Sequence, residues 1–131
     1  MTTGPRLRVL AAACSAVPGN GPASPAMLAL IDAVRADLDL VTVKTEDLSH
    51  TKRIGEARMF RVPVGMVPID QQRDVYMRAL GRQLDAEPYA IVHALDPFAG
   101  SVAAERRDTR GFLLAYEVTA LPEPEDEAHW L

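Results

Sequence analysis

The feature that most constrains the fold is the start of the chain, where an apolar run over residues 7–13 leads through a Gly/Pro-rich loop into a helical pattern. A continuous apolar run is typical of a strand that is buried on both faces of a parallel sheet. A Gly-rich turn before a helix presents backbone N–H groups and the positive end of the helix dipole. These features predict a Rossmann-like domain whose ligand lies at this turn.

The glycine pattern of this loop leaves an alternative open. Gly19 and Gly21 form a Gly-x-Gly pair without the third glycine of the dinucleotide fingerprint, and no Gly-Lys-Ser/Thr follows as in a P-loop. A strand-to-helix turn that binds nothing is the structural alternative to a ligand loop.

Three helices are predicted from apolar spacing and from residues that suit helix starts. Ser24 is a good N-cap, Pro25 suits the first turn, and apolar residues at helical spacing extend this helix over residues 25–37. We expect Asp70 to cap a second helix that ends near residue 86. We expect Asp96 to cap a third, over residues 97–107.

Strands are predicted from apolar and β-branched runs over residues 7–13, 38–44, 58–64, 89–95 and 112–118. The first and fourth runs are the most continuously apolar, so we place them at the centre of the sheet. The predicted fold, over residues 1–120, is a three-layer, Rossmann-like α/β domain with a mostly parallel sheet of about five strands in the order 3-2-1-4-5.

The segments between and after these elements read as irregular structure. Pro63 and Pro68 confine the third strand to a sheet edge or mark its end. Residues 45–57 are polar without a clear period and predict a surface loop. Residues 121–131 form an acidic Pro/Glu-rich tail without an apolar face.

Charge and cysteine content exclude several classes of function. The 131 residues include 14 Lys and Arg and 18 Asp and Glu, a net charge of −4, which predicts no binding of nucleic acid. Cys14 is the one cysteine, so we expect it to pack in the core, in the reducing setting of the cytoplasm. No apolar stretch is long enough for a transmembrane segment. His50 and His129 show no metal-ligand spacing, so we expect no metal site.

Three segments resemble a known family. They are the loop Gly19-Asn20-Gly21, the run Glu-Pro-Tyr-Ala-Ile-Val-His-Ala-Leu-Asp-Pro over residues 87–97, and Leu-Ala-Tyr-Glu-Val-Thr over residues 114–119. In order and spacing they resemble the N-terminal, acceptor-side domain of retaining GT-B glycosyltransferases of the family 4 type. The resemblance spans nearly the whole chain. It implies a Gly loop near the donor diphosphate and a second domain that binds the nucleotide sugar, and it implies that this chain is a truncated half.

The sequence departs from the family at two positions. Leu95 replaces the second histidine of the middle motif, and Thr119 stands at the position of the active-site histidine. A threonine hydroxyl cannot do the work of an imidazole near neutral pH. The resemblance therefore implies an isolated chain that is inactive and has no cofactor of its own, with a nucleotide sugar bound only by a complete two-domain enzyme.

Each candidate site residue has both a possible structural role and a possible functional role. His93 is favoured as a core or strand-end histidine over a catalytic one, and Asp96 as a helix cap over a ligand contact. Glu117, at the end of a buried strand, has to be solvated, paired or functional. No catalytic residue is assigned; the resemblance places Glu117 and Thr119 at the family's active-site position. The candidate ligand-binding residues are Gly19, Asn20, Gly21, Ser24, His93 and Asp96.

Two functions from different classes are consistent with these observations. The leading hypothesis is a truncated or split glycosyltransferase half that needs a donor-binding partner. The alternative is a non-catalytic interaction or scaffold protein that has kept the fold. Because the sheet stops at the run over residues 112–118, we expect a second copy of the chain, a separate donor-binding subunit or the chain's own tail to cover it, and we favour the homodimer.

Overall fold

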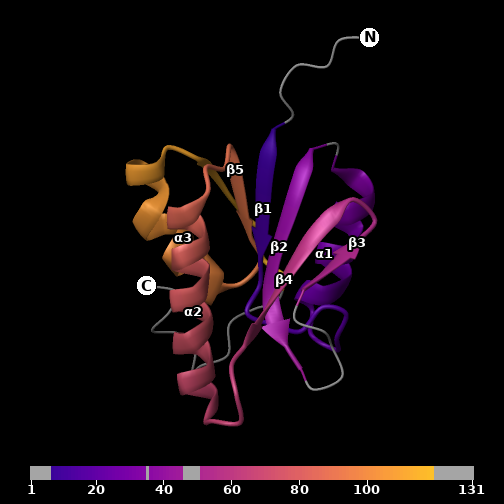
Figure 1. Cartoon of the computed structure of the whole chain (residues 1–131), viewed down its shortest axis with the longest axis vertical. Coiled ribbons are helices and arrows are strands. Elements are labelled where there is room, and N and C mark those ends of the chain that lie inside the picture. The colour runs from indigo at the N-terminus through magenta and orange to yellow at the C-terminus, as the bar shows by residue number, and fades with distance from the viewer. Residues whose placement is uncertain (1–6, 35, 46–50, 120–131) are drawn as a thin grey trace.

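A six-stranded sheet lies between two layers of helices in the computed structural model, which describes residues 7–34, 36–45 and 51–119 (Figure 1). The strand order is β3-β4-β2-β1-β5-β6. The elements, in chain order, are β1 (Arg8–Ala12), α1 (Ala23–Ala33), β2 (Asp37–Lys44), β3 (Thr51–Ile54), β4 (Ala57–Pro63), α2 (Ile69–Ala86), β5 (Ile91–Ala94), α3 (Pro97–Arg110) and β6 (Leu113–Tyr116).

The centre of the sheet is where the apolar runs predicted it. β1 lies between β2 and β5 and pairs with both in parallel, with Val9 opposite Leu38 on one side and Ile91 on the other. Leu10 and Ala11 are fully buried because helices cover both faces of this strand. The Rossmann-like α/β class, the parallel character of the main sheet and the central position of β1 and β5 are confirmed.

The helices divide between the two faces of the sheet. α1 covers one face and packs its buried Met27 against alternate strand residues such as Leu40. α2 and α3 lie together on the other face, where Leu80 and Val102 pack on Leu10 (Figure 1). Because successive side chains of a strand point to opposite faces, each strand contributes side chains to two separate cores.

The strand β3 was not predicted from the sequence. β3 pairs antiparallel with β4 across a tight turn in which Gly55 has a φ of 60°, a conformation that favours glycine. It falls in the segment expected to be a loop, so that expectation was wrong for residues 51–54. Its position adds a sixth strand outside the five predicted ones, whose own order holds. β4 is therefore internal, and Pro63 is its last residue.

Two predicted helix caps were wrong. α1 covers Ala23–Ala33. It begins before Ser24, which lies inside the first turn, because the preceding Pro22 already has helical dihedral angles. α2 begins at Ile69 directly after Pro68, and Asp70 is a first-turn residue without a capping hydrogen bond. The third cap is confirmed.

Asp96 caps α3, accepting a hydrogen bond from the Ala99 N–H at 2.8 Å. The helix continues to Arg110, three residues further than predicted, because Gly111 supplies the left-handed C-cap with a φ of 76°.

The last strand differs in burial from its prediction. β6 covers residues 113–116 and is largely exposed, so Glu117 follows an edge strand and not a buried one. The apolar run was a poor guide here because apolar residues also occur on exposed edges. The predicted tail over residues 121–131 lies outside the described residues, and the division of the chain at residue 120 stays a prediction.

Candidate functional site

The predicted site residues gather at the carboxyl ends of three neighbouring strands, β1, β5 and β6. From β1 the chain crosses through α1 to β2, and from β5 it crosses through α3 to β6 on the opposite side. Loops that leave adjacent strands in opposite directions open a crevice, and open α/β sheets bind ligands at such a switch point.

The Gly loop after β1 is held in one conformation by its neighbours. The Gly19 N–H donates to Ser24 Oγ at 3.0 Å, and buried Arg61 donates from Nη2 to the Val17 carbonyl at 3.0 Å. A Cβ on Gly19 would lie 2.4 Å from the carbonyl oxygen of Ala16. Glycine is therefore required at position 19 by close backbone approach.

Gly21 has a different environment. A Cβ at this position would meet only Ser15 Oγ, at 3.7 Å, which is ordinary van der Waals contact. Asn20 beside it is exposed. The part of the loop around Gly21 thus leaves room for a ligand to approach the backbone.

Asp96 joins the β1 and β5 loops. One carboxylate oxygen caps α3, and the other accepts a hydrogen bond from the Cys14 N–H at the end of β1. Burial raises the pKa of Asp96, while hydrogen bonds from backbone N–H groups partly offset that rise. Both oxygens are therefore occupied by the fold.

His93 and Glu117 form the second cluster. Their side chains meet at 3.0 Å between Nε2 and Oε1, and they are 21% and 41% exposed. Leu95 lies in the core, and its carbonyl accepts a hydrogen bond from the Thr119 hydroxyl at 3.1 Å. The structure pairs Gly19 with Ser24 and His93 with Glu117, and within the described part of the chain no hydrogen bond joins one pair to the other.

Cys14 is unsuited to nucleophilic chemistry. Burial, with the charge of Asp96 adding to it, raises the pKa of its thiol to about 12. The thiolate is the reactive form of cysteine, so we expect this side chain to react slowly near neutral pH.

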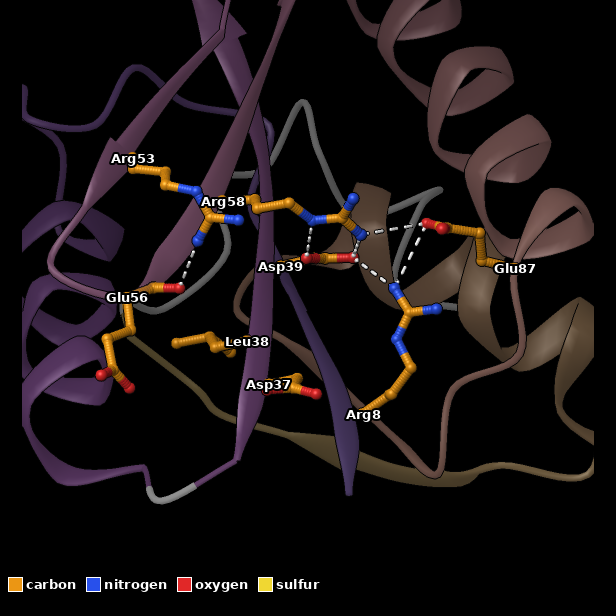
Figure 2. Close-up of a pocket in the computed structure, with 8 residues that line it drawn as sticks. All are labelled: Arg8, Asp37, Leu38, Asp39, Arg53, Glu56, Arg58 and Glu87. Carbon is orange, nitrogen blue, oxygen red and sulfur yellow. Dashed lines mark hydrogen bonds and ion pairs between the residues drawn. The ribbon is translucent and has the colours of Figure 1, made fainter. Parts of the chain in front are cut away.

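A hollow that the sequence did not predict lies at the opposite, amino end of the sheet (Figure 2). It has a volume of about 480 Å³. Its lining comes from the starts of β1, β2 and β4, from the β3–β4 hairpin and from the end of α2: Arg8, Asp37, Leu38, Asp39, Arg53, Glu56, Arg58 and Glu87.

Asp39 is the centre of this hollow's charge network, with a side chain that is only 4% exposed. Arg58 donates to both of its oxygens at 2.8 and 2.7 Å, Arg8 donates at 3.1 Å and the Tyr89 hydroxyl at 2.6 Å. Glu87 forms a second carboxylate bridge, 3.4 Å from Arg8 and 3.3 Å from Arg58 (Figure 2).

The charges in this network compensate one another. Burial alone raises the pKa of Asp39, but hydrogen bonds from Arg58 and Tyr89 and the two guanidinium charges outweigh it, so the pKa lies below its ordinary value. The arrangement crosslinks β1, β2 and β4 and leaves no unpaired buried carboxylate at Asp39. Its one sequence signal was an Asp inside the apolar and β-branched run over residues 38–43.

The described part of the chain has neither a metal-binding cluster nor a membrane-spanning helix. Within residues 7–34, 36–45 and 51–119, no group of three or more His, Cys, Asp or Glu side chains is placed to hold a metal ion. Of the helices in this part of the chain, none has the length and apolar character needed to cross a membrane.

Comparison with known proteins relates the chain to solved structures through its fold. No family model matches the sequence, and no curated protein matches it. The chain is similar to sucrose-phosphate synthase from Thermosynechococcus elongatus, with a TM-score of 0.66, 16% identity, and coverage of 85% of this chain and 32% of that one. A second structure of sucrose-phosphate synthase from this organism gives a TM-score of 0.61, 15% identity, and coverage of 93% and 66%.

These matches define a class of fold. The chain spans about a third of the length of the first structure. At such low identity the likeness shows a shared Rossmann-like α/β architecture, and fold alone does not specify function.

Proposed function

We propose that this domain is the acceptor-side half of a GT-B glycosyltransferase, which transfers sugar only together with a donor-binding domain or subunit. The observation that supports it most is the coincidence of two independent likenesses. The segments over residues 19–21, 87–97 and 114–119 resemble glycosyltransferases, and the fold is similar to an enzyme named for making a sugar phosphate. In this chain Gly19, Gly21, Asp96 and Thr119, which belong to these segments, lie at the carboxyl ends of neighbouring strands of one sheet.

In this proposal the chain's own residues bind and orient, and the partner supplies the donor. The backbone beside Gly21 has room for a ligand. A phosphate-bearing ligand suits this position because a Gly-rich turn before a helix favours anions. Glu117 is a half-exposed carboxylate that can accept hydrogen bonds from sugar hydroxyls. The rigid anchoring of the loop by Arg61 and Ser24 keeps it preorganised.

One observation favours the alternative, a non-catalytic interaction protein. Asp96 uses both carboxylate oxygens on backbone N–H groups, and the Thr119 hydroxyl, at the position of the family's active-site histidine, is bonded to a backbone carbonyl. Polar groups that form hydrogen bonds only with the backbone stabilise the fold. A protein that has kept the architecture and lost catalytic activity would retain such groups.

Backbone NMR titration of the purified chain tests the proposal. We expect the amides of residues 19–21, 23 and 24 to shift with a sugar phosphate, and to shift less with inorganic phosphate. Gly21→Ala should weaken that response while leaving the melting temperature unchanged, because its Cβ meets only ordinary contacts. If none of these probes moves the loop amides at millimolar concentration, the interaction-protein alternative replaces the proposal.

Turnover is a separate readout. We expect the isolated chain to transfer no sugar, because stabilising a departing diphosphate requires cationic groups that the family draws from its second domain. Turnover of a nucleotide sugar by the purified chain, lost in Gly21→Ala, would contradict the need for a donor-binding partner.

A further inference from the structure

The two edges of the described sheet differ in chemistry. β3, at one edge, is a four-residue strand, Thr-Lys-Arg-Ile, with two basic residues in its sequence. β6, at the other, reads Leu-Leu-Ala-Tyr and contains neither a charged residue nor a proline. Proteins usually guard an exposed edge against pairing with charges, prolines or bulges. The β6 edge lacks the charge and the proline that would block another strand.

The backbone of β6 also directs N–H and C=O groups away from β5. The Leu113 N–H donates to the Ala90 carbonyl at 3.0 Å, and the Glu117 N–H donates to the Ala94 carbonyl at 2.9 Å. Because successive residues of a strand direct their N–H and C=O groups to opposite sides, Leu114 directs both groups away from β5. Among the described residues, no strand lies on that side.

Apolar side chains on β6 are exposed as well. Leu113 is 71% exposed, and Ala115, which lies on the same face of the strand, is also exposed. Tyr116 points to the opposite face, where its ring lies against Gly100 of α3. The face carrying Leu113 and Ala115 therefore has a large and a small apolar side chain two residues apart.

We propose that β6 pairs antiparallel with β6 of a second copy of this chain, about a two-fold axis at Leu114. In this register the outward N–H and C=O of Leu114 bond reciprocally with those of Leu114 of the partner subunit. Leu113 lies opposite Ala115 of the partner subunit, so a large side chain meets a small one on both sides of the axis. A two-fold interface must be self-complementary in this way.

The residues that flank β6 favour the same orientation. Arg110, in the last turn of α3, precedes the strand, and Glu117 follows it. Antiparallel pairing brings the basic end of one strand beside the acidic end of the other, whereas parallel pairing would bring like charges together. Arg110 also holds Asp85, at 2.9 Å, but that carboxylate has Arg106 as a second partner at 3.1 Å.

Sedimentation of the full chain over a micromolar concentration series tests this pairing. We expect a reversible monomer–dimer equilibrium, because a single strand pair buries too little area for tight association. Leu114→Pro removes the outward N–H while sparing the bonds to β5, and should raise the dimer dissociation constant about tenfold or more. The matched control Leu114→Ala loses the same side-chain packing but keeps the N–H, and should remain dimeric. A wild-type chain that stays monomeric throughout, or a control that dissociates like the proline variant, overturns the proposal.

Hydrogen exchange of the wild-type Leu114 amide gives a second measurement that needs no variant. Protection that rises with protein concentration supports pairing between copies. Protection that is independent of concentration means that another part of the same chain covers the edge, and fast exchange at all concentrations means that nothing does. Either of these two results overturns the proposal, and neither bears on sugar binding at the Gly loop.

Discussion

The substitution Asp39→Asn removes the negative charge from the centre of the amino-end network while keeping the shape of the side chain. Asp39 is nearly fully buried and accepts hydrogen bonds from Arg58, Arg8 and Tyr89. An Asn amide nitrogen cannot accept a hydrogen bond, so at least one guanidinium donor would face another donor. We therefore expect a marked loss of folding free energy with no change of fold.

The magnitude follows from the burial of each partner. Removing one member of a fully buried ion pair costs about 3–5 kcal/mol. Here the side chains of Arg8 and Arg58 are 32% and 36% exposed, and Glu87 still contacts both. Solvent and the second carboxylate reduce the loss, so we expect about 2–4 kcal/mol. At this chain length that corresponds to a drop in melting temperature of roughly 10 °C.

Urea unfolding of the wild type and of two variants measures this loss. Asp37→Asn, two residues earlier on the same strand and exposed, is the matched control and should cost at most about 1 kcal/mol. The reasoning is refuted if Asp39→Asn costs no more than this control.

The same variant predicts a pH dependence. Because the pKa of Asp39 is lower in the folded chain than in the unfolded one, the folded state binds fewer protons in weak acid. Its contribution is complete above the unfolded pKa of about 3.9 and is lost as the pH falls through the lower folded value. The difference between wild type and Asp39→Asn should therefore be constant near neutrality and shrink below about pH 4; a difference that grows in acid would contradict the sign.

Three further predictions concern the core and the Gly loop. Cys14 should resist alkylation at neutral pH in the native chain and react readily in urea, because burial raises its pKa to about 12; equal rates in both states would contradict this. Gly19→Ala should lower the melting temperature, since its Cβ would lie 2.4 Å from the Ala16 carbonyl oxygen, and an unchanged value would show that the loop can move. Tyr76→Phe should cost about 1 kcal/mol in urea unfolding, because its buried hydroxyl donates to the Val41 carbonyl at 2.8 Å. A change below about 0.3 kcal/mol would mean that this hydrogen bond adds no net stability.

The order of the five predicted strands could be read from the sequence because it depends on burial and connection rules. Residues 7–13 and 89–95 are the most apolar runs, and a strand covered on both faces must be apolar throughout. The Asp96 cap was equally predictable, because a capping hydrogen bond joins residues only three positions apart.

The two failed caps have a common physical reason. Ser24 and Asp70 are preferred capping residues, but each follows a proline, Pro22 or Pro68, whose ring restricts φ to values that suit the start of a helix. The helix then begins before the capping residue. Local composition therefore predicts the region in which a helix starts, but the backbone conformation decides which residue is the first.

The layered α/β architecture follows from the sequence alone, since strand and helix periods and the Gly/Pro turns act over a few residues. Contacts between distant segments, in contrast, make an edge strand of the polar segment over residues 51–54, because its pairing partner, β4, supplies the hydrogen bonds. Such contacts also pair Asp39 with Arg58 and His93 with Glu117. The members of these pairs are 19 and 24 residues apart in the chain, and a charge has no periodicity that reveals which distant side chain it will meet.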